Sequence, residues 1–477
     1  MTTRTRIIAT IGPQNANADS LNELLAAGMN IARLNGSHNT LKWHEETIKQ
    51  IQKVSANIPI LLDIPGRKIR TVLTDKPLIF KRGGLIILTT DTKQAAANMI
   101  AVSFEKLHEF LNPGQVVFAD DGTLKFEVEK VAGSEITLRA FMDGRLGSRK
   151  GLNAPGVDLG PVLVTDEDRT MISFAKDNKI DFIGLSFVES EKHVKMIRDV
   201  LGSSEYPRIV SKIENQIGYF NMQEIIEASD AIMIDRGDLS VETDLETIAL
   251  RQKAIIRTAQ ILSKPVIVAT EMLNSMIVNS FPSKAEVSDV TNAVLDGCAA
   301  TMLSGETAVG SFPIEAVTTM RKIIEHTESF VSSGLIAGLK SPDINRANDA
   351  TARAIALICE STEIDKIIAV TRSGFAARTL SSLAVNCPII AVSDVAANSK
   401  SFNIYAGVTG VVFPGKFSTS DVSHVPAVVK YLWQQKFITD DEHILLTALA
   451  YPTSGKRMNL IETHLVGDLA RSLAWRS

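Results

Sequence analysis

The sequence predicts an α/β protein with a closed (β/α)8 TIM barrel, a small β-barrel lid domain inserted after the third strand, and a C-terminal α/β open-sheet domain. Three observations lead to this fold class. Short apolar runs with polar ends alternate with longer amphipathic stretches along much of the chain. One interval between two such runs is far longer than the others, and the alternation restarts after about residue 341.

The barrel is predicted from eight apolar runs, because parallel strands covered on both faces are continuously apolar. They are "RIIATIG" from Arg6, "MNIARLN" from Met29, "IPILLDI" from Ile58, "DFIGLSF" from Asp181, "RIVSKIEN" from Arg208, "AIMIDRGD" from Ala231, "PVIVATEM" from Pro265 and "ATMLSGET" from Ala300. Helix-compatible stretches such as "SLNELLAAGM" and "SEKHVKMIRDVL" separate them. Eight alternations of strand and helix favour a closed barrel.

The inserted domain is predicted from the interval after residue 64, which spans about 120 residues where one unit needs about 30. It contains "KPLIFKRGGLIILTT" and "GQVVFADDGTLKFEVEKVAGSEITLRA", short alternating runs typical of a small antiparallel β domain. We expect it to close over the barrel mouth. The predicted domains are residues 1–66 with 163–340 for the barrel, 67–162 for the lid and 341–477 for a regulatory and oligomerisation domain.

The C-terminal part repeats the α/β pattern in "DATARAIALICEST", "KIIAVTRSGFAARTLSSL", "PIIAVS", "GVTGVVF" and "HILLTALA". It is too short for a second barrel, so an open sheet flanked by helices is expected. "SPDINRAND" is the predicted linker.

Composition excludes several classes of protein. The chain has 477 residues, 45% of them hydrophobic, a net charge of -4 and a pI near 6.1, so it is not expected to bind nucleic acid. Cys298, Cys359 and Cys387 have no metal-like spacing and are interpreted as packing residues of a reducing compartment. No export signal begins the sequence and no run of about 18 apolar residues occurs, so a cytoplasmic protein without membrane spans is expected.

The predicted strand ends carry polar residues that suit chemistry. Catalytic groups of such barrels lie at the carboxyl ends of the strands. The residues at these positions are Arg33, Asn35, Ser37, Asp63, Lys212, Glu214, Asp238, Thr270, Ser304 and Glu306. We therefore expect them to converge at one mouth of the barrel.

Lys212 and Glu214 in "IVSKIENQ" are two residues apart, so in a strand they point to the same side. Glu214 and Asp238, on adjacent strands, would hold a Mg²⁺ through carboxylate oxygens. Lys212 would then be a fixed positive charge beside the metal, which suits a developing negative charge on a phosphoryl group or an enolate.

Each signal alone also has a purely structural interpretation. Lys212 with Glu214 could be a structural ion pair, Asn35 and Ser37 could cap a turn or helix, and Asp63 before Pro65 could form a turn. The functional interpretation is favoured because these residues fall at equivalent positions of one architecture. A barrel by itself specifies no reaction.

The motifs that carry these residues resemble, in order and spacing, those of the pyruvate kinase family. They are "ATIGPQN", "GMNIARLNGSH", "LLDIPGRKIRT", "ADDG", "RKGLNAPG", "SKIENQIG", "IMIDRGDLSVE", "VIVATEMLNSM", "SKAEVSDVTNAVLDG" and "MLSGETAVGSFPIEAV". The resemblance implies phosphoryl transfer from phosphoenolpyruvate to ADP, giving ATP and pyruvate in the last step of glycolysis. It also implies a barrel with a mobile lid and a C-terminal α/β domain, assembled as a homotetramer.

The resemblance further implies a role for each matching position. Catalytic roles fall to Lys212, Arg33, Thr270 and Ser304, and substrate binding to Arg33, Lys212, Gly237, Asp238 and Thr270. Glu214 and Asp238 would bind Mg²⁺ or Mn²⁺, and Asn35, Ser37 and Asp63 would line a monovalent-cation pocket. Nucleotide binding falls to Pro13, Arg33, Asn35, His38, Trp43, Arg70 and Lys150, with Asp121 also on the lid side.

"LDIPGRKIRT" departs from the family pattern Leu-Asp-Thr-Lys-Gly-Pro-Glu-Ile-Arg-Thr, because Ile64 replaces the Thr and Lys68 replaces the acidic residue. In K⁺-activated members the cation lies close to that acid. A lysine ammonium is a compact monovalent charge. Our hypothesis is that Lys68 supplies what K⁺ supplies elsewhere, so that K⁺ is dispensable; the alternative is a solvated surface lysine.

Three further departures are Gly36 in place of an aromatic residue, Asp235 in place of a small residue, and Val309 in place of a basic one. An added acid near two metal-binding carboxylates raises like-charge repulsion. Asp235 would therefore alter metal affinity or pair with Arg67 or another lid arginine.

"VTRSGFAARTL" resembles the family's loop for a phosphorylated effector, which Thr371, Arg372, Ser373 and Gly374 would bind. Ala376 departs from the usual Ser or Thr, and "YPTSGKRMN" resembles the second effector segment only loosely. Two other functions stay open: a Mg²⁺-dependent lyase or aldolase acting through a pyruvate enolate, and a catalytically inactive metabolite sensor.

Overall fold

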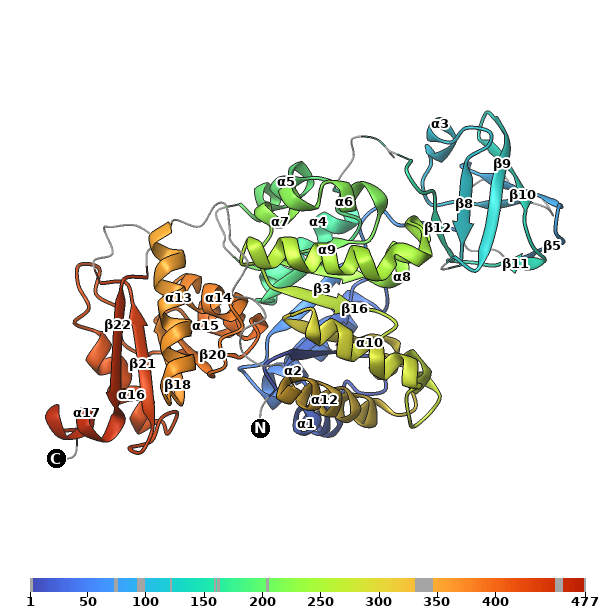
Figure 1. Cartoon of the computed structure of the whole chain (residues 1–477). Coiled ribbons are helices and arrows are strands. Elements are labelled where there is room, and N and C mark those ends of the chain that lie inside the picture. The colour runs from blue at the N-terminus through green and yellow to red at the C-terminus, as the bar shows by residue number, and fades with distance from the viewer. Residues whose placement is uncertain are drawn as a thin grey trace.

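The computed structural model describes residues 3–72, 76–91, 99–120, 122–157, 160, 164–202, 206–330, 346–450 and 458–475. Eight parallel strands form a closed barrel in the order β1-β17-β16-β15-β14-β13-β3-β2 (Figure 1). These strands are β1 (Arg6–Thr10), β2 (Ile31–Asn35), β3 (Ile60–Ile64), β13 (Phe182–Leu185), β14 (Arg208–Ile213), β15 (Ala231–Asp235), β16 (Val266–Ala269) and β17 (Ala300–Leu303). The predicted barrel and its eight strands are confirmed.

Side chains alternate between the inside and the outside of the barrel, as the period of two requires. Inward positions such as Ile8, Val210 and Met233 fill the interior, whereas their neighbours in sequence pack against the surrounding helices. The helices are α1 (Ala18–Ala27), α2 (Leu41–Val54), α4 (Asp166–Asp177), α5 (Glu191–Leu201), α6 (Gln216–Phe220), α7 (Met222–Ala228), α8 (Arg236–Glu242), α9 (Ile248–Ile261), α10 (Lys284–Leu295), α11 (Gly305–Ala308) and α12 (Pro313–Phe330). Capping boxes at Thr165 and Ser283 start α4 and α10.

The lid is a seven-stranded sheet in the order β4-β12-β8-β9-β10-β6-β7 with a two-stranded ribbon of β5 and β11. Its elements are β4 (Ile69–Arg70), β5 (Leu78–Phe80), β6 (Leu85–Thr89), β7 (Met99–Ala101), α3 (Leu107–Phe110), β8 (Val116–Ala119), β9 (Leu124–Ala132), β10 (Glu135–Ala140), β11 (Gly144–Leu146) and β12 (Gly151–Asn153). A bridge between Thr71 and Val102 joins the two edges of the sheet, so it closes as a small barrel. The prediction of an antiparallel domain is wrong for one pair, because β6 and β7 run parallel.

The C-terminal domain is an open five-stranded sheet in the order β20-β19-β18-β21-β22, in which only β22 runs antiparallel to its neighbour among the described strands. Helices α13 and α14 pack on one face and α16 and α17 on the other. The elements are α13 (Arg346–Ser361), β18 (Lys366–Val370), α14 (Phe375–Ser382), β19 (Ile389–Ser393), α15 (Ala396–Ser401), β20 (Val408–Val412), α16 (Val425–Gln434), β21 (His443–Ala448), β22 (Leu460–Leu465) and α17 (Val466–Ser472). The predicted open sheet with flanking helices is confirmed.

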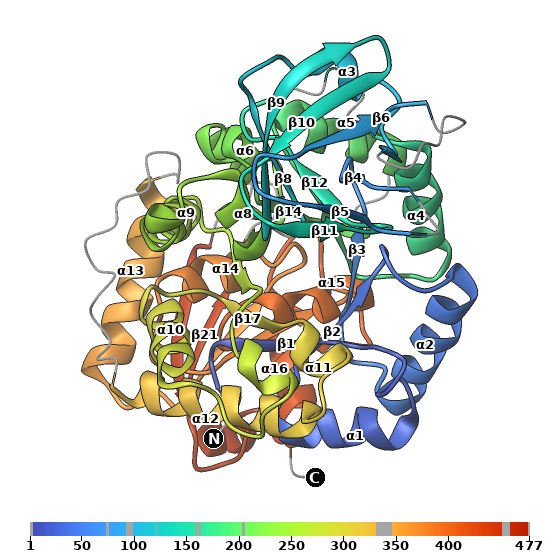
Figure 2. The same cartoon turned by 90° about the vertical axis from the view of Figure 1, so that its right-hand side faces the viewer.

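The C-terminal domain is attached at the amino ends of the barrel strands, on the side away from the lid (Figure 1). Arg6 at the start of β1 donates to the Tyr405 carbonyl at 3.2 Å, and Arg208 at the start of β14 donates to the Tyr405 hydroxyl at 3.1 Å. The view in Figure 2 is from the lid side, with β9 and β10 projecting beyond the barrel. The C-terminal domain therefore leaves the carboxyl ends of the strands uncovered, where the predicted functional residues lie.

Some predicted boundaries fall outside the described residues, namely the lid end at residue 162 and the domain start at residue 341. The predicted linker 341–349 is wrong in its last four residues, because α13 begins at Arg346. An acid in the first turn of this helix, Asp349, pairs with Arg353 one turn later at 2.9 Å. No helix in the described part of the chain has the length and apolarity needed to cross a membrane.

We predict that Phe126→Ala will unfold the lid selectively, because the lid has its own hydrophobic core. Phe126 is fully buried there and meets Phe80 edge-on, with ring centroids 5.2 Å apart. Removing such a ring costs roughly 3–5 kcal/mol. Limited proteolysis should then cleave within residues 67–162 and leave barrel and C-terminal fragments intact.

Phe141→Ala is the matched control for this test, since Phe141 is a lid residue with 42% of its surface exposed. Equal cleavage over the whole chain in the Phe126 variant would contradict an independent lid core.

Candidate active site

Lys212 lies between two carboxylates at the carboxyl end of the barrel. Its Nζ is 2.8 Å from Glu214 Oε2 and 2.9 Å from Asp235 Oδ2. Ser186 Oγ accepts a further hydrogen bond from this ammonium at 3.4 Å. Lys212 and Glu214 therefore stand together, as their spacing in the strand predicts, and Asp235 joins them from the neighbouring strand β15.

Burial and charge act against each other on these groups. Burial would lower the pKa of Lys212, but Asp235 and Glu214 outweigh it and hold that pKa well above its usual value. Burial would raise the pKa of Asp235, yet the Lys212 ammonium lowers it to about 2. Burial raises the pKa of Glu214 to about 8; Lys212 opposes this shift, and Asp235 and Asp238 add to it. A site with this many buried carboxylates favours the entry of a cation.

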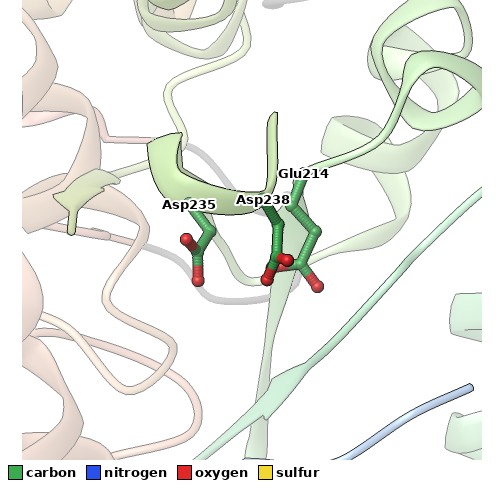
Figure 3. Close-up of side chains that lie close together, drawn as sticks. All are labelled: Glu214, Asp235 and Asp238. Carbon is green, nitrogen blue, oxygen red and sulfur yellow. The ribbon is translucent and has the colours of Figure 1, made fainter. Parts of the chain in front are cut away.

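Oxygens of Glu214, Asp235 and Asp238 lie within 4.8 Å of one another. Figure 3 shows the carboxylates of Glu214 and Asp238 turned toward each other, with Asp235 to one side of them. The Phe187 N–H donates to Glu214 Oε1 at 2.6 Å, whereas Oε2 has no hydrogen-bond partner among the described residues beyond its ion pair with Lys212. Hard oxygen donors around a small gap fit Mg²⁺ or Mn²⁺, and the predicted pair of Glu214 and Asp238 suits this ion best.

Lys68 reaches into the same mouth from the start of the lid. Its Nζ is 2.7 Å from Asp238 Oδ1 and lies 5.7 Å from the centre of the Phe187 ring. Both side chains of the pair are about 85% buried, with 15% and 14% of their surfaces exposed. Lys68 is therefore not a solvated surface lysine.

In the predicted monovalent-cation pocket, Asp63 is paired with Arg33. Arg33 donates from Nη2 and Nε to Asp63 Oδ2 at 2.7 and 3.0 Å, and from Nη1 to Thr10 at 3.3 Å. Asp63 Oδ1 is buried with no hydrogen-bond partner among the described residues, which leaves one oxygen for a cation. Asn35 Oδ1 accepts from the Ser37 N–H at 3.2 Å, as a turn residue does.

Thr270 and Gly237 are brought together on the other side of Asp235. The Gly237 N–H donates to Thr270 Oγ1 at 2.8 Å, so in this structure it is already used by a protein group. Arg236 holds the Thr270 carbonyl at 2.7 Å and pairs with Asp289 at 2.6 Å. Ser304, predicted to help Thr270, has a buried hydroxyl with no partner in the described part of the chain.

The predicted nucleotide-binding residues are only partly brought together. Burial lowers the pKa of His38, and the charges of Arg70 and Arg33 lower it further, so these three side chains are close enough to interact electrostatically. Lys150 is paired on the lid side with Asp120 at 2.7 Å.

Three of the other predicted nucleotide positions are Trp43, Pro13 and Asp121. Trp43 packs against the outer core of the barrel and contacts the His44 ring. Pro13 is exposed. Asp121 lies outside the described residues.

The structure explains two of the departures from the family pattern. A Cβ at Gly36 would lie 2.5 Å from the Asp63 carbonyl oxygen and 2.6 Å from Met171 Cε, so this backbone has no room for an aromatic residue. Asp235 pairs with Lys212 and not with Arg67, whose partner is Glu189 at 2.6 Å. Val309 is 60% exposed, and nothing in the structure accounts for its replacing a basic residue.

Sequence reasoning missed the contact that joins the lid to the site. Asn153 at the end of β12 donates to Glu242 Oε1 at 2.9 Å, and Glu242 ends the same helix, α8, that carries Asp238. It also missed Ser186 beside Lys212. Both pairings join residues far apart in sequence, although the acid after "RGDLSV" sits one helical turn from Asp238, which is a usable signal.

Comparison with known proteins identifies relatives over nearly the whole chain. Residues 2–317 match the family model described as pyruvate kinase, barrel domain, and residues 349–464 match pyruvate kinase, alpha/beta domain. A pyruvate kinase of Bacillus licheniformis is 35% identical over 98% of this chain and 81% of its own length. One of Schizosaccharomyces pombe is 36% identical over 91% and 88%. A crystal structure of a pyruvate kinase from Cryptosporidium parvum superposes with a TM-score of 0.88 at 30% identity, covering 98% and 96% of the two chains.

We predict that Glu242→Gln will stabilise the metal-free protein at high pH and leave it nearly unchanged at pH 4. Burial raises the pKa of Glu242 to about 7; the Asn153 hydrogen bond opposes this shift, and Asp238 adds to it. Its contribution to stability is therefore present below the unfolded pKa and lost as pH rises through 7. The gain at pH 8.5 should be roughly 3 kcal/mol, measured by thermal unfolding.

Glu246→Gln on the exposed turn before α9 controls for the loss of one negative charge. A gap between Glu242→Gln and wild type that stays constant from pH 5 to pH 8.5 would show that Glu242 does not titrate in this range.

Proposed function

The chain belongs to the pyruvate kinase family, and on this premise we propose which of its residues carry the reaction. The activity is that of a phosphotransferase, which moves the phosphoryl group of phosphoenolpyruvate to ADP and yields ATP and pyruvate in glycolysis. The relatives do not favour the lyase or the inactive-sensor alternative. Members of the family generally use Mg²⁺ and usually K⁺.

The observation that carries the assignment of residues is the position of Lys212. Its buried ammonium lies within 2.9 Å of two carboxylates, one of which, Glu214, also faces Asp238. A fixed positive charge beside a pair of metal-binding carboxylates stabilises negative charge that develops on transferred oxygens. Lys212 would neutralise the phosphoryl group in flight and the enolate that it leaves.

The remaining roles follow from placement around Lys212. Glu214 and Asp238 would hold Mg²⁺, which when bound would supply positive charge that stabilises negative charge on the substrate. Arg33, held by Asp63, would present its planar guanidinium to phosphate oxygens. Thr270 and Ser304 would organise the path of the proton that reaches the methylene carbon.

Further nucleotide contacts are proposed for the residues at the rim. Gly237 would offer its N–H to the substrate carboxylate after release from Thr270. Pro13, Asn35, His38, Trp43, Arg70 and Lys150 would contact ADP, with Lys150 reaching it from the lid.

Lys68 would take the place of a K⁺ ion. It is buried, positively charged and 2.7 Å from Asp238, next to the carboxylates that a monovalent cation would otherwise help to balance. Asn35, Ser37 and Asp63 keep the oxygen atoms of the predicted pocket. The Lys68 ammonium would supply the positive charge of the cation, so that the enzyme is active without added K⁺.

The C-terminal loop of Thr371, Arg372, Ser373 and Gly374 would bind a phosphorylated effector. Gly374 has a left-handed backbone with φ 79° and precedes α14, so N–H groups gather at this turn. Arg372 is held by Asp394 at 3.0 Å and by the Phe417 carbonyl at 2.7 Å, and would have to exchange one of these contacts for phosphate.

Assembly as a homotetramer in the cytoplasm is proposed from the family and from apolar surface on the barrel. Six apolar side chains of the described barrel residues have more than 65% of their surface exposed, and a second copy of the chain would cover part of this surface. They are Phe220, Leu245, Leu250, Val278, Phe281 and Phe330.

We predict that Lys212→Met abolishes pyruvate formation from phosphoenolpyruvate and ADP with Mg²⁺. The variant loses the charge that stabilises the transferred group, which is worth at least about 100-fold in rate. Circular dichroism and thermal unfolding check that the fold remains, and Lys212→Arg tests a charge of different shape. A near-normal rate in Lys212→Met would refute the role.

We predict high activity in buffer free of K⁺, with little change when K⁺ is added. Lys68→Glu restores the acidic residue of K⁺-activated members and should make activity depend on added K⁺; Lys68→Met separates loss of the ammonium from gain of an acid. Tetramethylammonium holds the ionic strength constant. A wild-type enzyme that is active only with K⁺ would disprove the role of Lys68 and leave the reaction itself intact.

A further inference from the structure

Asp235 is the last residue of β15 and points into the barrel mouth. Met233 and Ala231, two and four residues earlier, fill the interior of the barrel, so the period of two aims Asp235 the same way. Its side chain is only 9% exposed. The resemblance to the family assigns this position a small residue and no role.

Both oxygens of Asp235 are engaged, and by different neighbouring strands. Oδ2 is 2.9 Å from Lys212 Nζ on β14, and Oδ1 accepts from Thr270 Oγ1 at 3.1 Å, directly after β16. Strand β15 pairs with β14 on one side and with β16 on the other. One carboxylate thus spans three consecutive strand ends.

The contact between Asp235 and Lys212 matters most when Glu214 binds a divalent cation. A carboxylate that binds a divalent cation has less charge to share with an ammonium. Asp235 stands apart from the facing pair of Glu214 and Asp238 (Figure 3). It is thus the partner that still holds Lys212 when those two bind the metal.

The contact to Thr270 orients a hydroxyl group. Thr270 Oγ1 accepts the Gly237 N–H at 2.8 Å, and its single proton is shared between Asp235 Oδ1 at 3.1 Å and the Ala269 carbonyl at 2.6 Å. A small residue at position 235 would leave only the carbonyl. Asp235 therefore provides a second acceptor for the Thr270 hydroxyl proton, on the same carboxylate that pairs with Lys212.

We propose that Asp235 is a positioning residue that holds the Lys212 ammonium and the Thr270 hydroxyl in one fixed arrangement, so that phosphoryl transfer and protonation of the enolate share one carboxylate. This inference rests on the proposed function. In this proposal Asp235 is not a metal ligand. Ligation by Asp235 is the alternative to test, because its oxygens lie within 4.8 Å of those of Glu214 and Asp238.

Asp235→Asn, Asp235→Ala and Asp235→Glu test the proposal. Steady-state assays with phosphoenolpyruvate and ADP should show kcat lower by about 10- to 100-fold in the Asn and Ala variants, with KM for phosphoenolpyruvate within about three-fold. Proton NMR of pyruvate in D₂O with Mg²⁺ and ATP should show slower exchange of the methyl hydrogens by a similar factor. Asp235→Glu, which keeps the carboxylate, should recover part of both rates.

Binding of Mn²⁺ to the phosphoenolpyruvate-free protein, measured from the signal of free Mn²⁺ in electron paramagnetic resonance, separates positioning from ligation. Loss of one nearby negative charge should weaken Mn²⁺ binding in Asp235→Asn, but far less than loss of a ligand does in Asp238→Asn. A loss as large as that in Asp238→Asn would overturn the proposal and make Asp235 a ligand. Wild-type kcat and wild-type methyl exchange in Asp235→Asn would also overturn it.

Asp230→Asn is the matched control, because Asp230 precedes the opposite end of β15 and pairs with Arg198 at 3.0 Å, away from the mouth. It should retain both rates, and equal losses in the two variants would reduce the effect to general destabilisation of the strand and refute positioning. If the wild-type protein forms no pyruvate, the proposed function itself fails. If the wild-type protein forms pyruvate and Asp235→Asn forms it at the same rate, only this inference fails.

Discussion

The mouth of the barrel depends on one buried ammonium held between two carboxylates of adjacent strands. Glu214, Asp235 and Asp238 have oxygens within 4.8 Å of one another, and without Lys212 their mutual repulsion in a buried site would oppose folding. Lys212 is 93% buried as a side chain, so its own desolvation is offset only by these partners. Its position is set by the register of β14 with β15, in which Lys212 faces Met233, and that register is fixed by the apolar residues on the outside of the barrel. The hydrophobic core thus determines where the charge stands.

The lid enters this charge network directly. Lys68, four residues after the end of β3, pairs with Asp238, and Asn153 at the end of β12 pairs with Glu242 on the same helix, α8. Arg67 reaches Glu189 at 2.6 Å on the barrel. Each contact lies near a point where the chain passes between barrel and lid. Movement of the lid would therefore disturb the partners of Asp238, and a change of charge at Asp238 would be felt at the lid.

The sequence alone was enough to predict what depends on local periodicity. Eight apolar runs specified the eight strands, and a spacing of two specified that Lys212 meets Glu214. Contacts between distant residues were less accessible: the partner of Lys68, Asp238, lies 170 residues away, whereas the sequence links this lysine to the monovalent-cation pocket of Asn35, Ser37 and Asp63. The absence of room at Gly36 depends on Met171 of α4, a packing contact that no local pattern reports. The pairing of Asp235 with Lys212 was not predicted: Arg67 or another lid arginine was the expected partner, and the contact with Lys212 depends on the pairing of β14 with β15.

Charge balance explains why the two departures from the family pattern, Lys68 and Asp235, occur in one chain. Among the described residues, the ion pairs around Lys212, Lys68 and Arg33 comprise these three cations and four carboxylates, Asp63, Glu214, Asp235 and Asp238, a formal charge of -1. The family pattern has an acid in place of Lys68 and a small residue in place of Asp235, which leaves two cations and four carboxylates, and a bound K⁺ then brings that mouth to the same formal charge. Lys68 without Asp235 would leave the mouth neutral and weaken its attraction for a divalent cation. Asp235 thus restores the field that an internal ammonium would otherwise remove, and the two substitutions form one electrostatic unit.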